Sequence, residues 1–131
     1  MKNTIFHLAI PCKDVAEAKT YYVDQLGFGQ GRMYDDRISI NFFGDQVVCH
    51  LCPEKVDPIV EMYPRHYGQT FTCEMAFDEF YQRVLESGVA LYKALFVRFE
   101  GKKEAHKTFF LVDPSNNLLE FKYYFDQSQN F

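Results

Sequence analysis

The chain has 131 residues, a formal net charge of −4, and 47% hydrophobic and 18% aromatic residues. This size and apolar content are typical of a globular domain and exclude a disordered chain. The lysines are scattered and form no basic stripe, so we predict no nucleic-acid partner. No apolar run approaches about 18 residues, and the first residues lack the pattern of a signal peptide. We therefore predict no membrane partner and a cytoplasmic localisation.

The four cysteines, Cys12, Cys49, Cys52 and Cys73, are expected to stay reduced, because the chain carries no secretion signal. Cys49 and Cys52 form a CxxC pair, which can bind zinc together with a second pair. Cys12 and Cys73 are not spaced as that second pair. We therefore expect neither disulfides nor a structural zinc site.

The first half of the chain predicts the element order βαβββ. Residues 4–11 alternate as a strand does, and Asp14 is placed to cap a helix that ends at Gly27. The helix has apolar positions at Val15, Ala18, Tyr22 and Leu26. Three strands are predicted at about 31–36, 37–43 and 46–52, with a tight turn at residues 44–45 between the last two. A connector with three prolines follows, up to Pro64.

The second half repeats this order. Residues 66–73 predict a strand, and an apolar stripe predicts a helix that Gly88 ends. Three strands follow, at about 90–99, 106–112 and 118–125. We therefore predict an α+β fold in one domain, residues 1–131, with module one at about 4–56 and module two at about 66–125.

Spacing links the two halves. His7 and His66 each lie about 20 residues before the glycine that ends the following helix, so they occupy equivalent positions. The same comparison matches His50 with Glu120, each on the last strand of its half. If the two halves are related by a pseudo-twofold, these four side chains meet at one place.

Glu120 lies on a strand in which Leu119, Phe121 and Tyr123 share one face, while Leu118, Glu120 and Lys122 share the other. A glutamate in a strand is most often a surface charge, and a single histidine is most often a hydrogen-bonded strand residue. Three histidines and one glutamate at repeat-equivalent positions favour a metal site instead.

Two imidazoles and one carboxylate leave coordination positions open, which suits a redox-active Fe(II) or Mn(II). His50 is interpreted either as a fourth ligand or as an acid–base residue. His106 matches no repeat position, and we interpret it as a surface residue or, at most, as one that supports the metal ligands. Glu74 is too close to Gly88 to be a ligand on the first strand of the module, and we expect it at the N-terminus of the helix.

Several segments carry a family resemblance: FHLAIP, LGF followed by GR, INFFGDQVVCHL, HYG, VRFEG and DPSNNLLEFK. In this order they resemble the vicinal oxygen chelate superfamily, and within it the small dioxygenase-like branch related to glyoxalases and bleomycin resistance proteins. The resemblance spans nearly the whole chain. It departs from the family at SNN, where the hairpin usually has a glycine, and at AHKT, where a more polar stretch is usual.

The resemblance implies two βαβββ modules forming a cup-shaped mixed β-sheet around a metal site, the glyoxalase/bleomycin resistance/dioxygenase fold. It implies one divalent metal per chain, bound by His7, His66 and Glu120, with Fe(II) favoured over Mn, Zn or Ni. His50 falls where glyoxalases have a fourth ligand and close to where extradiol dioxygenases have an acid–base histidine. A homodimer is also implied, with residues 54–64 and 125–131 as expected contributors.

Three functions are consistent with this resemblance. The first is a metal-dependent dioxygenase acting on a small catechol-like substrate that binds through vicinal oxygens, with His50 as the proton carrier. The second is a glyoxalase-like lyase or isomerase, in which His50 is a ligand and no oxygen is consumed. The third is a non-catalytic small-molecule binding or resistance protein.

Overall fold

The computed structural model describes residues 2–131, and the chain divides into two compact units. The first unit comprises the chain up to Val60 together with residues 113–117. The second unit comprises residues 61–112 and 118–131. Each unit contains one four-stranded mixed sheet.

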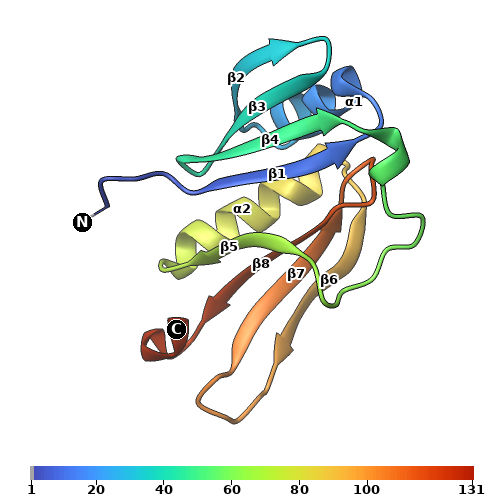
Figure 1. The fold of residues 1–131 in the computed structure, drawn as a ribbon. Coiled ribbons are helices and arrows are strands. Elements are labelled where there is room, and N and C mark those ends of the chain that lie inside the picture. Colours follow the sequence, from blue (N-terminus) through green and yellow to red (C-terminus); the bar gives the residue numbers. More distant parts are fainter. Residues whose placement is uncertain (1) are drawn as a thin grey trace. The chain divides into compact units, whose positions relative to one another are not determined.

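The sheet of the first unit has the strand order β1-β4-β3-β2 (Figure 1). β1 runs parallel to β4, and the other neighbours are antiparallel. The strands are β1 (His7–Cys12), β2 (Gly29–Tyr34), β3 (Arg37–Phe42) and β4 (Asp45–Leu51). The tight turn before β4 uses Phe43 and Gly44, both at positive φ, one residue earlier than predicted. A 3-10 turn, η2 (Pro53–Lys55), follows β4.

The helix of the first unit begins where the sequence predicts. The Asp14 side chain accepts a hydrogen bond from the backbone N–H of Glu17 at 2.9 Å, which caps α1 (Val15–Lys19). The chain then continues as a π-helix, η1 (Thr20–Gln25), where a continuous α-helix was predicted. Tyr21 and Tyr22 in this segment are both buried. We attribute the wider turn to the packing of two consecutive large rings on the core side.

The second unit repeats the arrangement, with the strand order β5-β8-β7-β6. β5 runs parallel to β8, and the remaining neighbours are antiparallel. The strands are β5 (Tyr67–Phe71), β6 (Leu91–Arg98), β7 (His106–Val112) and β8 (Leu118–Tyr124). The helix α2 (Glu74–Ser87) ends at Gly88, whose φ of 76° is the left-handed cap that the sequence predicts. A short 3-10 helix, η3 (Gln127–Asn130), follows β8.

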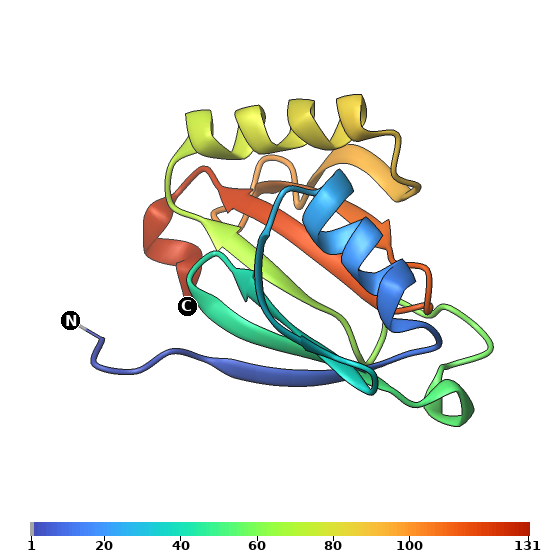
Figure 2. The same cartoon turned by 90° about the horizontal axis from the view of Figure 1, so that it is seen from above.

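The two faces of the second sheet differ in character. α2 lies across one face (Figure 2), where Phe109 and Phe121 are fully buried and the Lys107 ammonium pairs with Glu74 and Asp78. Because side chains alternate along a strand, Thr108 and Glu120 lie on the opposite face, which α2 does not cover. Glu74 is the first residue of α2, as predicted.

The turn between β7 and β8 belongs to the first unit, although its strands belong to the second. Its Asp113 is buried and accepts a hydrogen bond from the Tyr22 hydroxyl at 2.6 Å. The Asn117 side chain donates to the Pro11 carbonyl oxygen at 2.9 Å. Asn116 takes a left-handed φ of 62°, a conformation that asparagine adopts more readily than other residues with a side chain.

Two mixed sheets built from repeated βαβββ units confirm the predicted α+β class and module order. In the part of the chain that the structure describes, no helix is both long enough and apolar enough to cross a membrane. All four cysteines are free thiols, and Cys12 and Cys49 are buried.

Candidate metal-binding site

His66 and Glu120 form a close pair in the second unit. His66 directly precedes β5, and Glu120 lies near the middle of β8, on the face away from α2. The His66 Nε2 atom is 3.1 Å from Glu120 Oε1. Glu120 is 8% exposed, so it is not the solvated surface charge that a strand glutamate most often is.

The tautomer of His66 is fixed by the backbone. Its Nδ1 lies 2.7 Å from the carbonyl oxygen of Met62, and a carbonyl oxygen only accepts, so Nδ1 carries the proton. In the neutral imidazole, Nε2 then presents a lone pair to a carboxylate oxygen. Two acceptors at this distance repel each other unless a proton or a metal ion lies between them.

This donor pair fits a divalent metal. Ligands about 2.1 Å from a metal and roughly at right angles are separated by about 3.0 Å, close to the observed 3.1 Å. An imidazole whose other nitrogen donates to a backbone carbonyl is the arrangement typical of metal-binding histidines.

The second oxygen of Glu120 is held by Thr108. The Thr108 hydroxyl donates to Glu120 Oε2 at 2.7 Å, and Thr108 is fully buried. Sequence reasoning missed this residue. The pairing of the two strands of the hairpin could have identified it, because Thr108 is paired with Lys122 and therefore lies on the same sheet face as Glu120.

Gly68 sets how closely β5 approaches β8. It is paired with Glu120, and a Cβ placed on Gly68 would lie 1.6 Å from the Glu120 carbonyl oxygen. No other residue type fits this position without a shift of the backbone. The glycine of HYG therefore fixes the position of the strand that carries the carboxylate.

His7 shows the same tautomer pattern in the first unit. Its Nδ1 lies 2.6 Å from the side-chain oxygen of Gln46, which faces it across the β1–β4 pair. With Nδ1 donating, Nε2 of this exposed ring is the atom left to bind a metal.

The register of the parallel strand pairs corrects the equivalence drawn for His50. Gly68, two residues after His66, pairs with Glu120, and Ala9, two residues after His7, pairs with Val48. The residue equivalent to Glu120 is therefore Val48. Residue counting had matched His50, which lies two positions further along.

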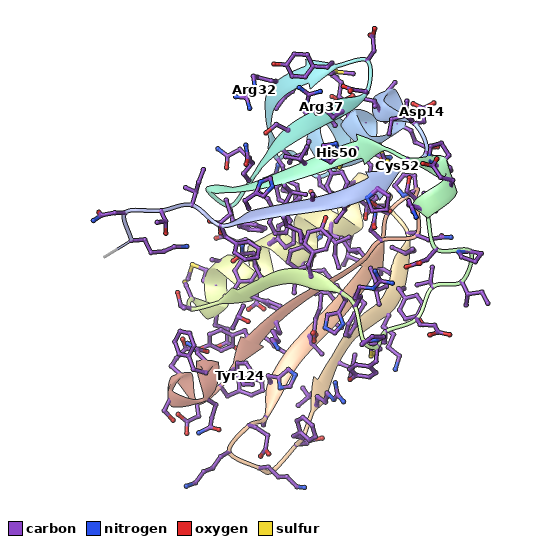
Figure 3. All side chains as sticks on the ribbon, viewed as in Figure 1. Asp14, Arg32, Arg37, His50, Cys52 and Tyr124 are labelled. Carbon is purple, nitrogen blue, oxygen red and sulfur yellow. The ribbon has the colours of Figure 1, made fainter. Side chains whose placement is uncertain are left out.

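By the same register, His50 is equivalent to Lys122, because Pro11 pairs with His50 and Thr70 pairs with Lys122. His50 is half-buried on β4 (Figure 3) and shares a sheet face with His7. It pairs with Pro11, whereas His7 pairs with Gln46, so the two histidines are offset by four residues, about 13 Å along the strands.

Of the two positions considered for His106, the one at the surface is wrong. The side chain is 4% exposed, its Nδ1 donates to the Glu104 carbonyl oxygen at 2.9 Å, and its ring lies 4.6 Å from that of Tyr124. The charged loop before it suggested exposure, but ring packing on the sheet face buries it.

Of the four predicted site residues, the structure brings His66 and Glu120 together within one unit, while His7 and His50 belong to the other unit. Among residues 2–131, no group of three or more His, Cys, Asp or Glu side chains is arranged to hold a metal ion. The part of the candidate site that the structure forms is therefore the His66–Glu120 pair, with the Met62 carbonyl and the Thr108 hydroxyl that hold it in place.

Comparison with solved structures supports the assignment of the fold. A crystal structure of a glyoxalase/bleomycin resistance protein/dioxygenase from Alicyclobacillus acidocaldarius is 53% identical, with a TM-score of 0.95 over 98% of this chain and 97% of that one. A fosfomycin resistance protein, FosX, from Listeria monocytogenes is 16% identical, with a TM-score of 0.72 over 98% and 99%. A lactoylglutathione lyase from Agrobacterium tumefaciens is 13% identical, with a TM-score of 0.69 over 99% and 98%. The last two share the fold alone.

No curated protein sequence matches the chain. The family model of the Glyoxalase/Bleomycin resistance protein/Dioxygenase superfamily matches residues 4–121, which is most of the sequence. Together with the repeated βαβββ units and the 53% identical structure, this match shows that the chain belongs to the Glyoxalase/Bleomycin resistance protein/Dioxygenase superfamily.

Proposed function

We propose that the protein is a metal-dependent, dioxygenase-like enzyme that acts on a small catechol-like substrate held through two neighbouring oxygens. The observation that supports the proposal is the His66–Glu120 pair, in which an imidazole nitrogen and a carboxylate oxygen face each other at 3.1 Å, the separation of two ligands on one metal ion. His66, Glu120 and His7 are the proposed ligands of one divalent metal per chain, preferably Fe(II).

When bound, such a metal supplies electrons and open positions for a chelating substrate and dioxygen. The chain's own residues prepare the ligands. The Met62 carbonyl orients the His66 ring, and the Thr108 hydroxyl holds one oxygen of Glu120, which leaves the other oxygen directed at His66. The Phe110 ring lies edge-on to His66 at 5.7 Å and limits the access of water to this side of the pair.

The proposal of three protein ligands is supported by Val48. A carboxylate at the position equivalent to Glu120 would supply a fourth protein ligand, and valine has no donor atom. Three ligands leave more positions for a substrate and dioxygen than four do, and this favours the oxygen-dependent reaction over the glyoxalase-like one.

Metal titration and oxygen uptake test the proposal together. Protein purified without chelator is analysed for metal, reconstituted with Fe(II), Mn(II) or Zn(II), and assayed for oxygen uptake on a panel of catechols. We expect one metal per chain, and a loss of affinity of at least about 100-fold in His66→Ala, Glu120→Gln and His7→Ala. No metal binding in any of the reconstituted samples would refute the site.

Three activity outcomes separate the candidate functions. Oxygen uptake with ring cleavage supports the dioxygenase. Isomerisation of a thiohemiacetal without oxygen uptake would instead identify a glyoxalase-like enzyme. Saturable binding of small aromatic compounds with no turnover would identify a binding or resistance protein.

The proposed acid–base role of His50 is tested by His50→Ala. Since we place His50 outside the ligand set, this variant should keep its metal affinity and lose turnover by about 10²–10⁴-fold. A loss of metal affinity as large as that of His66→Ala would make His50 a ligand. An unchanged turnover would remove His50 from the mechanism.

We also propose a homodimer. β6 is an edge strand of the second sheet, and exposed edges with apolar side chains need cover; Leu95 and Val97 on this strand are exposed. Light scattering at micromolar concentration should give about twice the chain mass of 15.4 kDa. A chain mass independent of concentration would contradict the dimer.

A further inference from the structure

The sheet face that carries Glu120 also carries three cationic side chains, the exposed Lys93 and the half-buried Arg98 and Lys122. Arg98 on β6 pairs with His106, which pairs with Tyr124 on β8, and these residues form one row across the sheet. Phe96, Thr108 and Lys122 form the next row. Arg98 and Lys122 are both half-buried, so these residues are partly removed from water.

In the part of the chain that the structure describes, neither Arg98 nor Lys122 pairs with an acidic side chain. The Arg98 guanidinium donates to the Tyr63 hydroxyl at 2.8 Å and lies 5.0 Å from the Phe99 ring. The Lys122 ammonium lies 5.4 Å from the ring of Tyr124, which is labelled in Figure 3. Among the described residues, no carboxylate lies within ion-pair distance of either side chain.

Lys107 on the other face of the same sheet provides the contrast. It is also half-buried, and it pairs with Glu74 at 3.0 Å as well as with Asp78. The α2 face thus neutralises its half-buried cation with acids from the helix, whereas the half-buried cations of the Glu120 face, Arg98 and Lys122, have no acid beside them among the described residues. A half-buried charge without a counter-charge is unfavourable unless a ligand supplies it.

The balance of charges on the second sheet also favours the binding of an anion. Glu120 is the single acidic residue in β5, β6, β7 and β8. Its two oxygens are already engaged, one with His66 and the other with Thr108. Arg98 and Lys122 therefore leave an excess of positive charge on this face, which attracts an anion.

We propose that Arg98 and Lys122 bind the acid group, a carboxylate, phosphate or phosphonate, of a small anionic substrate. This inference rests on the proposed function, because the remainder of that substrate would reach the His66–Glu120 pair. Lys122 is two residues beyond Glu120, about 7 Å along the strand. The acid group is thus separated from the reacting oxygens by a few bonds only.

The two cations are spaced to share one acid group. Their Cα atoms lie two strands and one row apart, about 12 Å by standard sheet spacings, and both side chains are long. A guanidinium matches the two oxygens of a carboxylate or phosphate, and an ammonium adds a point charge. The Tyr63 hydroxyl accepts from Arg98 and holds the guanidinium in position.

The test is an NMR titration of the isotope-labelled full chain with inorganic phosphate, with propionate and with the neutral diol 1,2-ethanediol. We expect saturable shifts at residues of β6 and β8 for the two anions. Arg98→Gln and Lys122→Met should each weaken anion binding by about 10- to 100-fold, the usual effect of losing a charge-assisted hydrogen bond. Diol binding should be equal in all variants.

Two further variants control this experiment. Lys102→Met removes the same charge from an exposed loop of the second unit and should leave anion affinity unchanged. Lys122→Arg keeps the charge and should retain binding, so a loss in Lys122→Met alone is not a folding defect. Equal losses in Lys102→Met and Lys122→Met, or no saturable shifts in the unaltered protein, would overturn the acid-group site.

A parallel Zn(II) titration separates this inference from the proposed function. Metal binding that is equal in the unaltered protein and in Lys122→Met, without anion binding in either, refutes the acid-group site alone. Anion binding by a protein that takes up no metal supports the acid-group site and refutes the metal site.

Discussion

The two units have the same arrangement of strands, but they differ in the side chains at equivalent positions. In both, a histidine precedes or begins the first strand and donates its Nδ1 proton to an oxygen, that of Gln46 for His7 and that of Met62 for His66. Two residues later the first unit has Ala9 paired with Val48, where the second has Gly68 paired with Glu120.

This difference shows how a repeated fold acquires an asymmetric site. The imidazole is retained in both units, but the carboxylate is present in one only, together with the glycine that brings its neighbouring strand close. The proposed chemistry therefore depends on a few positions of the register and not on the element order, which is the same in both halves.

The largest expected effect comes from replacing Gly68 of the second unit with alanine, the residue at the equivalent position, Ala9, of the first unit. In Gly68→Ala the new Cβ meets the Glu120 carbonyl oxygen at 1.6 Å, so β5 or β8 has to move. We expect a loss of about 3 kcal/mol or more in the free energy of unfolding, since overpacking against backbone is poorly relieved. Urea unfolding measures this loss.

Ala9→Gly is the matched control, because it makes the reverse change at the equivalent position. It should cost only about 0.5–1 kcal/mol, the usual effect of glycine in a strand. Equal small losses for both variants would mean that the two strand pairs are equally spaced and would remove the structural role of Gly68.

Much of this scaffold was predictable from the sequence. Asp14 as a helix cap, Gly88 as a helix end and Glu74 as the first residue of α2 follow from local rules, because each depends on neighbours in the chain. The alternation along β8 also placed Glu120 and Lys122 on one face correctly.

The errors concern long-range pairing. Counting residues matched His50 with Glu120, but the loops of the two halves differ in length, and only the strand register identifies Val48 as the equivalent. The supporting role of Thr108 and the burial of His106 likewise depend on neighbours across the hairpin. Local sequence patterns contain no direct measure of such contacts.

A smaller effect is expected from replacing Val48 of the first unit with glutamate, the residue at the equivalent position, Glu120, of the second unit. If Val48 occupies the position of a fourth ligand, Val48→Glu should raise the affinity for Zn(II) by about 10-fold or more and lower any oxygen-dependent turnover, because a coordination position is filled. Isothermal titration with Zn(II) and oxygen uptake measure the two effects.

Val48→Met, which adds bulk without a carboxylate, is the control for repacking. It should leave Zn(II) affinity unchanged. Unchanged affinity in Val48→Glu, with the fold intact by circular dichroism, would show that residue 48 does not face the metal and would undo the equivalence drawn from the register.

The smallest predicted effect concerns the two hairpin turns. The β3–β4 turn of the first unit has two residues at positive φ, whereas the β7–β8 turn has five residues and buries Asp113. Burial raises the pKa of the Asp113 carboxyl above its ordinary value of 3.8, although hydrogen bonds from Tyr22, Asn117 and Ser115 act to lower it.

A raised pKa means that the folded protein holds this proton more tightly than the unfolded chain does. The contribution of Asp113 to stability is therefore fully present below the ordinary value and is lost as pH rises through the folded-state pKa. Asp113→Asn removes the titration and also disturbs hydrogen bonds, so it should be about 1–3 kcal/mol less stable. Urea unfolding of both proteins from pH 4 upward should give a stability difference that shrinks as pH rises. A difference that grows with pH would show that the hydrogen bonds to Asp113 outweigh its desolvation.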